Sequence, residues 1–134
     1  MAATASRNFT SQDVSHAVIT GAMKVHSFLG PGLLESTHLA CLQYELLDAG
    51  YFSPSRSSRG LSWVKLDLGY RMDVIVENLV VVEVKSVDAI SPVHQAQILS
   101  YIKLSGKSIG LLINLNVAHL KDGLKRFVNG TGWK

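Results

Sequence analysis

The stretch Val80–Val87 reads VVVEVKSV, so that Glu83 and Lys85 alternate with valines. Because successive side chains of a β-strand point to opposite faces, a strand here places Glu83 and Lys85 together on one face and three valines on the other. One face is then apolar and the other carries an acid beside a base. This stretch predicts a strand of a sheet that has a packed core on one side and polar chemistry on the other.

The sequence after this strand predicts a helix, a strand and a second helix. Ser91 is a good N-terminal cap, proline follows it at the first helical position, and Gly106 ends the predicted helix 92–104. The stretch 108–115, SIGLLINL, is apolar nearly throughout, as expected for a strand that is covered on both faces. A final helix is predicted over about 117–128.

Two helices are predicted before the strand, near the N-terminus. Thr10 followed by Asp13 resembles a capping box and predicts a helix over 11–28, which ends at the Gly-Pro-Gly sequence 30–32. A second helix is predicted over about 33–48, with Gly50 as its C-terminal cap. After it, SPSRSSRG at 53–60 reads as an exposed loop.

The hydrophobic period changes from 3.6 to 2 after this loop, which predicts strands over 62–68 and 70–76 before the strand at 80–87. The resulting order is ααβββαβα. This order predicts an α/β fold, with a mixed β-sheet flanked by helices. We expect one domain over residues 11–130, with tails at 1–10 and 131–134.

Composition sets broad limits on what this domain does. The chain has 134 residues, of which 47% are hydrophobic and 17% charged, as in one compact soluble domain. The single cysteine, Cys41, excludes an internal disulfide framework and multi-cysteine zinc sites. No apolar run reaches the ~18 residues of a membrane span, and the N-terminus lacks the apolar region of a secretory signal. We therefore expect a cytoplasmic protein that has no membrane partner.

Two acids and a lysine lie on neighbouring predicted strands. Asp73 can lie opposite Glu83 if the connection between the strands leaves three residues, Glu77–Leu79, unpaired. A two-residue turn would pair Asp73 with Val82 instead and place the two acids on opposite faces. We therefore predict the three-residue loop.

Two carboxylates held together repel each other, and a hard divalent cation such as Mg²⁺ removes that cost. A bound metal activates water, and a lysine beside it orients that water or offsets charge on phosphorus oxygens. The arrangement of Asp73, Glu83 and Lys85 is therefore a coherent site for phosphodiester hydrolysis. The alternative is that Glu83 and Lys85 form a solvent-facing ion pair on an amphipathic strand.

The predicted helix 92–104 adds polar groups to this site. Gln97 and Tyr101 are four residues apart and share a helix face, and His94 lies one turn earlier on the same side. His94 is more typical of a satisfied histidine than of a metal ligand. Glu35 lies in the first turn of the second predicted helix, where an acid is favoured by the helix dipole. Its alternative role is that of a third carboxylate that reaches the metal from outside the sheet.

These residues give the chain a resemblance to the GxxExxY family of the PD-(D/E)XK nuclease superfamily, in its RecB-like or λ-exonuclease-like branch. The matching blocks run in order along residues 11–130. They are GPGLLEST at 30–37, LDLGYRMDVIVEN at 66–78, VVVEVKSV at 80–87, PVHQAQILSYIKLSG at 92–106 and GLLINLNVAHLKDGLKRFVN at 110–129. The resemblance implies a restriction-endonuclease-like core with a site for Mg²⁺, which Mn²⁺ can replace.

The resemblance also implies a role for each site residue. Asp73, Glu83 and the backbone carbonyl of Val84 would be metal ligands, and Glu35 matches the helix glutamate that can join them. The catalytic lysine would be Lys85. Gln97 and Tyr101 match the Q-x3-Y element of RecB-like nucleases.

The chain departs from the family pattern in two places. His38 stands where the motif has its final tyrosine, and residues 53–62 form a short Ser/Arg-rich run where relatives carry a fuller hairpin. The first departure concerns the edge of the site near Glu35, and the second concerns the rim that would face the substrate.

The function expected from the sequence is therefore a metal-dependent nuclease that acts on nucleic acid, with DNA as the first choice. No recognition helix or zinc finger is legible, so binding would go through the phosphate backbone, which suits the net charge of +3. Related nucleases often dimerise, which makes a homodimer an open alternative. Two other functions stay open: a nuclease-fold module that binds nucleic acid or protein without cleaving, and a phosphoesterase for small ligands.

Overall fold

The computed structural model describes residues 9–52 and 74–129. The predicted loop 53–60 and strand 62–68, and the predicted strand 70–76 up to Asp73, lie outside the described residues. The elements run in the following order: α2 (Ser11–Leu29), α3 (Glu35–Asp48), β1 (Val74–Val76), β2 (Val80–Lys85), α4 (Pro92–Ser105), β3 (Ile109–Asn114), the short 3-10 helix η1 (Leu120–Gly123) and β4 (Leu124–Val128).

Local capping residues determine where α2 and α4 begin. At the start of α2, the Asp13 N–H donates to Thr10 Oγ1 at 3.0 Å and the Thr10 N–H donates to Asp13 Oδ2 at 3.1 Å. This reciprocal pair confirms the predicted capping box. Helix α4 has Ser91 as its cap and proline at its start, and it ends at Gly106 in the left-handed region, φ 76°. The predicted boundaries of both helices are confirmed to within one residue.

The four strands form one mixed sheet in the order β1-β2-β3-β4. Strands β1 and β2 are antiparallel, β2 and β3 are parallel, and β3 and β4 are antiparallel. Val74 pairs with Val82 and Val76 with Val80, which leaves Glu77–Leu79 as the loop. Glu77 and Asn78 have positive φ angles of 52° and 57°. The predicted three-residue connection is confirmed.

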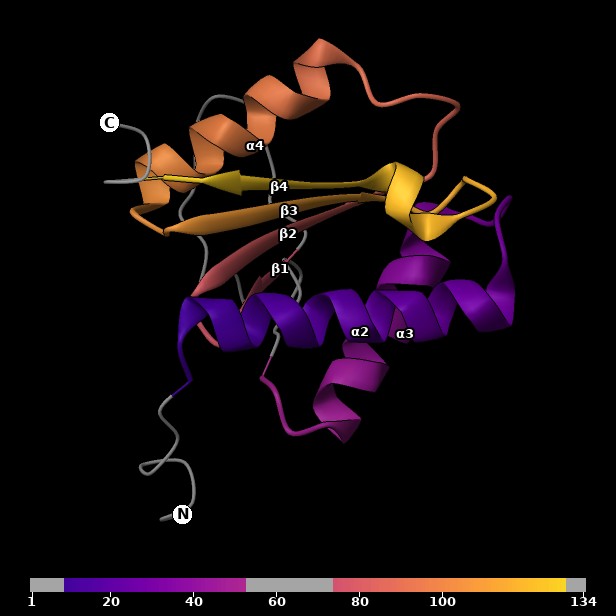
Figure 1. The fold of residues 1–134 in the computed structure, drawn as a ribbon, viewed down its shortest axis with the longest axis horizontal. Coiled ribbons are helices and arrows are strands. Elements are labelled where there is room, and N and C mark those ends of the chain that lie inside the picture. The colour runs from indigo at the N-terminus through magenta and orange to yellow at the C-terminus, as the bar shows by residue number, and fades with distance from the viewer. Residues whose placement is uncertain (1–8, 53–73, 130–134) are drawn as a thin grey trace.

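Helices cover both faces of this sheet (Figure 1): α4 lies on one face, and α2 and α3 lie on the other. The α2/α3 face holds the larger core, in which three valines of β2 pack with helix residues such as Val18 and Leu42. On the α4 face, Val81 and Leu112 pack against Ile98 and Tyr101 of the helix. The alternation read from Val80–Val87 is confirmed, because Val81 and its valine neighbours lie in different cores.

The predicted final helix over 117–128 is wrong, because the structure has η1 and the strand β4 in its place. β3 is buried along its whole length, and its outer backbone groups need hydrogen-bond partners. β4 supplies them, pairing Val128 with Ile109 and Leu124 with Ile113. Leu124 then packs on the α2/α3 core and Phe127 on the α4 core. Completion of the sheet therefore overrides the helical spacing of the apolar residues.

Gly110 is a test of how tightly α4 packs on β3. A Cβ built at Gly110 would lie 2.9 Å from Ile102 Cγ2 and 3.1 Å from Ile98 Cγ1. We expect Gly110→Ala to lower the free energy of unfolding by about 1–3 kcal/mol, because added volume in a packed core forces the helix outward. Urea denaturation followed by circular dichroism measures this. An unchanged midpoint would show that α4 moves away at no cost.

In the described part of the chain, no helix has the length and apolar character needed to cross a membrane.

Candidate active site

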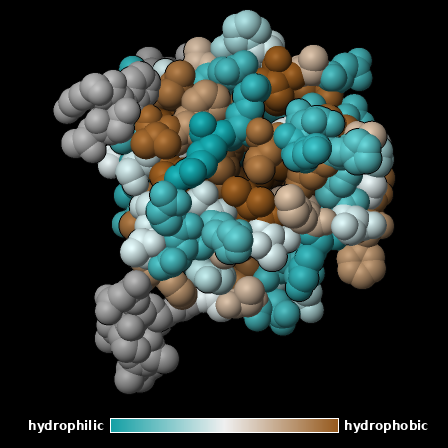
Figure 2. Space-filling view, viewed as in Figure 1, coloured by the Kyte–Doolittle hydropathy of each residue, from teal (hydrophilic) through white to brown (hydrophobic). Residues whose placement is uncertain are grey.

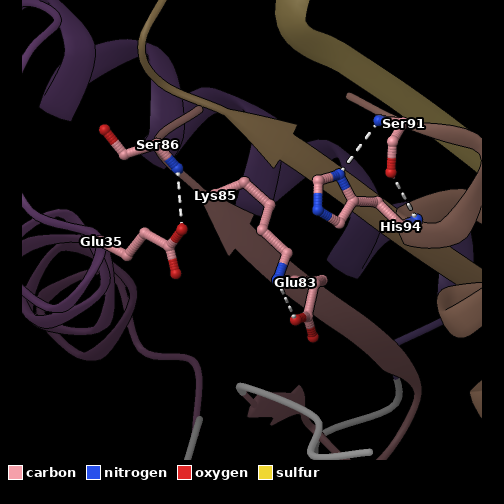
Figure 3. Close-up of polar contacts among 6 residues, drawn as sticks. All are labelled: Glu35, Glu83, Lys85, Ser86, Ser91 and His94. Atoms are coloured by element: carbon pink, nitrogen blue, oxygen red, sulfur yellow. Dashed lines mark hydrogen bonds and ion pairs between the residues drawn. The ribbon is translucent and has the colours of Figure 1, made fainter. Parts of the chain in front are cut away.

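The sheet brings Glu83 and Lys85 together on the α4 face of β2. Lys85 Nζ lies 3.3 Å from Glu83 Oε2, and the side chains are only 17% and 8% exposed. Figure 3 shows the lysine turned back along the strand toward the carboxylate. Since both side chains are largely buried, the alternative of a solvent-facing ion pair is wrong. A charged pair withdrawn from water is costly for stability alone, so it marks this face as a candidate active site.

Helix α4 forms the wall above this face. Tyr101 is 2% exposed and belongs to the same core as Val81, which shares the strand face of Glu83. Gln97 lies one helical turn before Tyr101 and is partly buried. The structure therefore places the predicted polar residues of α4 on the helix that covers the candidate site.

His94 has a structural role at the start of α4. Its Nδ1 accepts the Ser91 N–H at 3.0 Å, while its own N–H donates to Ser91 Oγ at 3.3 Å (Figure 3). The ring thereby takes the place that Glu or Gln has in an ordinary capping box. This supports the interpretation of His94 as a satisfied histidine.

Glu35 reaches the end of β2 from α3. Its Oε2 accepts the Ser86 N–H at 3.2 Å (Figure 3). Ser86 Oγ also donates to the Leu33 carbonyl at 2.7 Å. Two residues that are 51 positions apart thus meet next to Lys85. The structure therefore places the predicted helix glutamate next to the end of the strand that carries Glu83 and Lys85.

His38, one turn further along α3, is fully buried. Its Nε2 donates to the Gly30 carbonyl at 3.2 Å, and its Nδ1 is buried with no hydrogen-bond partner among the described residues. The ring therefore fastens α3 to the Gly-Pro-Gly turn that precedes it. His38, which stands where the GxxExxY motif has tyrosine, therefore has a structural role at the start of α3.

Asn114 belongs to this region and was not among the residues predicted from sequence. It ends β3, is 2% exposed, and pairs with Lys85 in the parallel ladder. Its amide group hydrogen-bonds both the N–H and the carbonyl of Val87. The available signal was a polar amide at the end of an otherwise apolar run, because a buried amide must find partners.

The donor chemistry on this face suits a hard cation. Glu83 offers carboxylate oxygens, the ligands that Mg²⁺ prefers. Among residues 9–52 and 74–129, no three His, Cys, Asp or Glu side chains gather into a metal-binding group. Asp73, the second predicted carboxylate, lies outside the described residues. Its neighbour Val74 pairs with Val82, the neighbour of Glu83, in the register that the prediction required.

A mixed sheet covered by helices on both faces, with a buried carboxylate–lysine pair on an inner strand, is consistent with a restriction-endonuclease-like fold. The family model of the PD-(D/E)XK nuclease superfamily matches residues 12–127, and the chain belongs to that superfamily. No curated protein and no solved structure gives a significant match to the chain.

Proposed function

We propose that this protein is a metal-dependent nuclease that hydrolyses phosphodiester bonds in DNA, with its active site on the α4 face of β2. The observation that supports the proposal most strongly is the largely buried Glu83–Lys85 pair, in which Lys85 Nζ lies 3.3 Å from Glu83 Oε2. The chain that carries this pair belongs to a nuclease superfamily. A binding module has no physical need for a charged pair withdrawn from water.

Within the superfamily, we assign the chain to the GxxExxY family of the RecB-like or λ-exonuclease-like branch. Gly32, Glu35 and His38 follow the spacing of the motif, with histidine in place of its tyrosine. The hydrogen bond from Ser86 to Glu35 supports the assignment, since it links the motif to the end of β2.

The proposed cofactor is Mg²⁺, with Mn²⁺ as a substitute. Asp73 and Glu83 would hold it with the Val84 carbonyl, and Glu35 would join them from α3. When bound, the metal would lower the pKa of its water and neutralise charge on the phosphoryl oxygens.

The remaining residues have roles of their own in this proposal. Lys85 would donate to the phosphate oxygens or orient the attacking water, because its ammonium is held at the carboxylate. Gln97 and Tyr101 would position substrate or water from the α4 wall. The resemblance assigns these roles to Gln97 and Tyr101, and both residues belong to α4, the helix that covers this face of the sheet.

The proposed partner is nucleic acid, bound through its phosphate backbone. The face that carries β4 is lined by hydrophilic side chains with hydrophobic ones grouped between them (Figure 2), and Lys125 and Arg126 are exposed on β4. Binding by such lysines and arginines weakens as salt increases.

We place the activity in the cytoplasm, because Cys41 has no second cysteine to pair with. A homodimer remains an alternative.

The deciding experiment is a calorimetric titration of the wild-type protein with Mn²⁺, together with a plasmid-nicking assay in Mg²⁺, Mn²⁺ or chelator. We expect the protein to bind metal and to nick DNA only when metal is present. The cation offsets the repulsion between the carboxylates, and the metal-activated water is the nucleophile that attacks the phosphate. Circular dichroism before and after chelation controls for folding.

The other outcomes separate the remaining functions. Folded protein that neither binds metal nor nicks DNA would contradict the proposal and favour the silent binding module. Cleavage of bis-(p-nitrophenyl) phosphate without cleavage of DNA would favour a phosphoesterase for small ligands.

A further inference from the structure

The side chain of Asn114 continues the sheet past the point where backbone pairing ends. Its Nδ2 donates to the Val87 carbonyl at 2.9 Å, and its Oδ1 accepts the Val87 N–H at 3.1 Å. The same Oδ1 accepts the Asn116 N–H at 3.1 Å. A primary amide has a donor and an acceptor side by side, so it can pair with a backbone residue as a peptide group does.

These contacts fix the chain directly after Lys85. The Leu115 N–H donates to the Lys85 carbonyl at 3.0 Å, and Asn114 then holds Val87, two residues further on. Asn114 and Lys85 are ladder partners, so the amide and the lysine lie on neighbouring strands. The backbone that sets the direction of the Lys85 side chain is therefore anchored by the end of β3.

We propose that Asn114 is a positioning residue, which holds the β2 end so that the Lys85 ammonium lies at the Glu83 carboxylate. The inference rests on the proposed function for its catalytic meaning only. Lys85 has a long and flexible side chain, and its position depends on a backbone that does not move. A displacement of about 1 Å at a catalytic group can cost 10²-fold in rate.

Few other residues can replace this amide. Aspartate keeps the shape and the acceptor oxygens but cannot donate to the Val87 carbonyl, and it adds a negative charge close to Lys85. Serine is too short to span both groups of Val87. Asn114→Ser therefore removes both contacts of Asn114 with Val87 and leaves the Asn116 Nδ2 donation to the Val87 carbonyl at 3.3 Å, whereas Asn114→Asp removes the donor and adds a charge.

Asn129 is a matched control within the same sheet. Its Nδ2 donates to the carbonyls of Ile102 and Lys107 at 3.1 and 3.2 Å, so it also bridges two segments by its amide. It lies at the opposite end of β3, where its N–H donates to the Ser108 carbonyl. Asn129→Ser removes a comparable structural contact far from Lys85.

The experiment measures three properties of each variant. The first is the NMR signal of the Lys85 side chain in metal-free protein, assigned with Lys85→Met. The second is the nicking rate per folded molecule at saturating Mn²⁺, and the third is the Mn²⁺ affinity from calorimetry. We expect both Asn114 variants to shift the Lys85 signal. Asn114→Ser should lose about 10- to 100-fold in rate with little change in metal affinity, and Asn129→Ser should resemble the wild type in all three measurements.

The outcomes separate this inference from the proposed function. An unmoved Lys85 signal in folded Asn114→Ser, or equal rate losses in Asn114→Ser and Asn129→Ser, would overturn the positioning role. A shifted signal in Asn114→Ser alone, in a protein whose wild type does not nick DNA, supports the positioning of Lys85 and contradicts the nuclease. If Asn114→Ser does not fold, Asn114→Gln gives the same comparison, because it keeps an uncharged amide but displaces it by one methylene from the groups of Val87.

Discussion

Glu83→Gln is expected to abolish Mn²⁺ binding and to lower plasmid nicking by at least about 10³-fold, as loss of a group essential to metal-assisted hydrolysis does. The substitution keeps the volume of the side chain and removes its charge. It also leaves the Lys85 ammonium, whose side chain is 17% exposed, without the anion that lies 3.3 Å away. We expect the metal-free variant to lose about 1.5–3 kcal/mol of unfolding free energy, the usual contribution of a hydrogen bond to a charged group.

Lys85→Met is the companion variant that separates metal binding from chemistry. It keeps the aliphatic stem and removes the ammonium, so we expect Mn²⁺ to bind at least as tightly while nicking falls by about 10²- to 10³-fold, the range for loss of one electrostatic donor. Calorimetry gives the affinity, and initial nicking rates at saturating metal give the activity.

Lys24 and Glu45 form a second ion pair that serves as the control. They lie 3.6 Å apart on α2 and α3, with side chains 65% and 24% exposed. Glu45→Gln and Lys24→Met should leave metal binding and nicking unchanged, because this pair lies on the helices of the other sheet face. Nicking by Glu83→Gln at the wild-type rate would contradict the assignment of this site.

Gly123→Ala is expected to cause the largest loss of stability among single substitutions of the described glycines. A Cβ at Gly123 would collide with the backbone carbonyl of Asn114 and would also lie 3.1 Å from Val117 Cγ2. The first neighbour is backbone and cannot rotate away. We expect a loss of about 3 kcal/mol or more, the upper end for overpacking, measured by chemical denaturation.

Gly106→Ala is the control for this prediction. Gly106 has φ 76° with nothing within 4 Å of an added Cβ, so the substitution tests backbone strain without collision. We expect it to cost about 1–2 kcal/mol, the cost of a left-handed residue. If Gly123→Ala were no worse than Gly106→Ala, the close approach of η1 to the end of β3 would be incorrect.

The starts of α2 and α4 and the faces of β2 were predictable because they depend on residues close together in the chain, whereas α3 begins at Glu35, about two residues later than predicted. The Thr10–Asp13 and Ser91–Pro92 signals act within three residues, and the caps they predict are present. The period of two over Val80–Val87 assigned Glu83 and Lys85 to one face, and the structure shows them paired. The hairpin loop that the position of Asp73 depends on is confirmed. The position of Asp73 itself stays a prediction, because this residue lies outside the described part of the chain.

The last element was not predictable in the same way. Its apolar residues fit a helix, and Gly123 was the local sign against one. This segment forms a strand because β3 is buried along its whole length and the backbone groups on its outer edge need hydrogen-bond partners, which β4 supplies. The outer edge of β4 carries charged side chains, which disfavour pairing with a further strand. Lys125 and Arg126 are exposed on β4, and Arg126 donates to Gln12 Oε1 at 3.0 Å.

The sequence by itself determined the caps of α2 and α4, the alternation of β2, the length of its hairpin loop and the acid and lysine that mark the site. Each of these depends on backbone geometry over a few residues. Only the tertiary structure decided that β4 is a strand, that Glu35 meets Ser86, and that Asn114 holds Val87. These contacts join residues 27 or more positions apart or depend on a neighbouring strand, and burial then forces each polar group to find a partner.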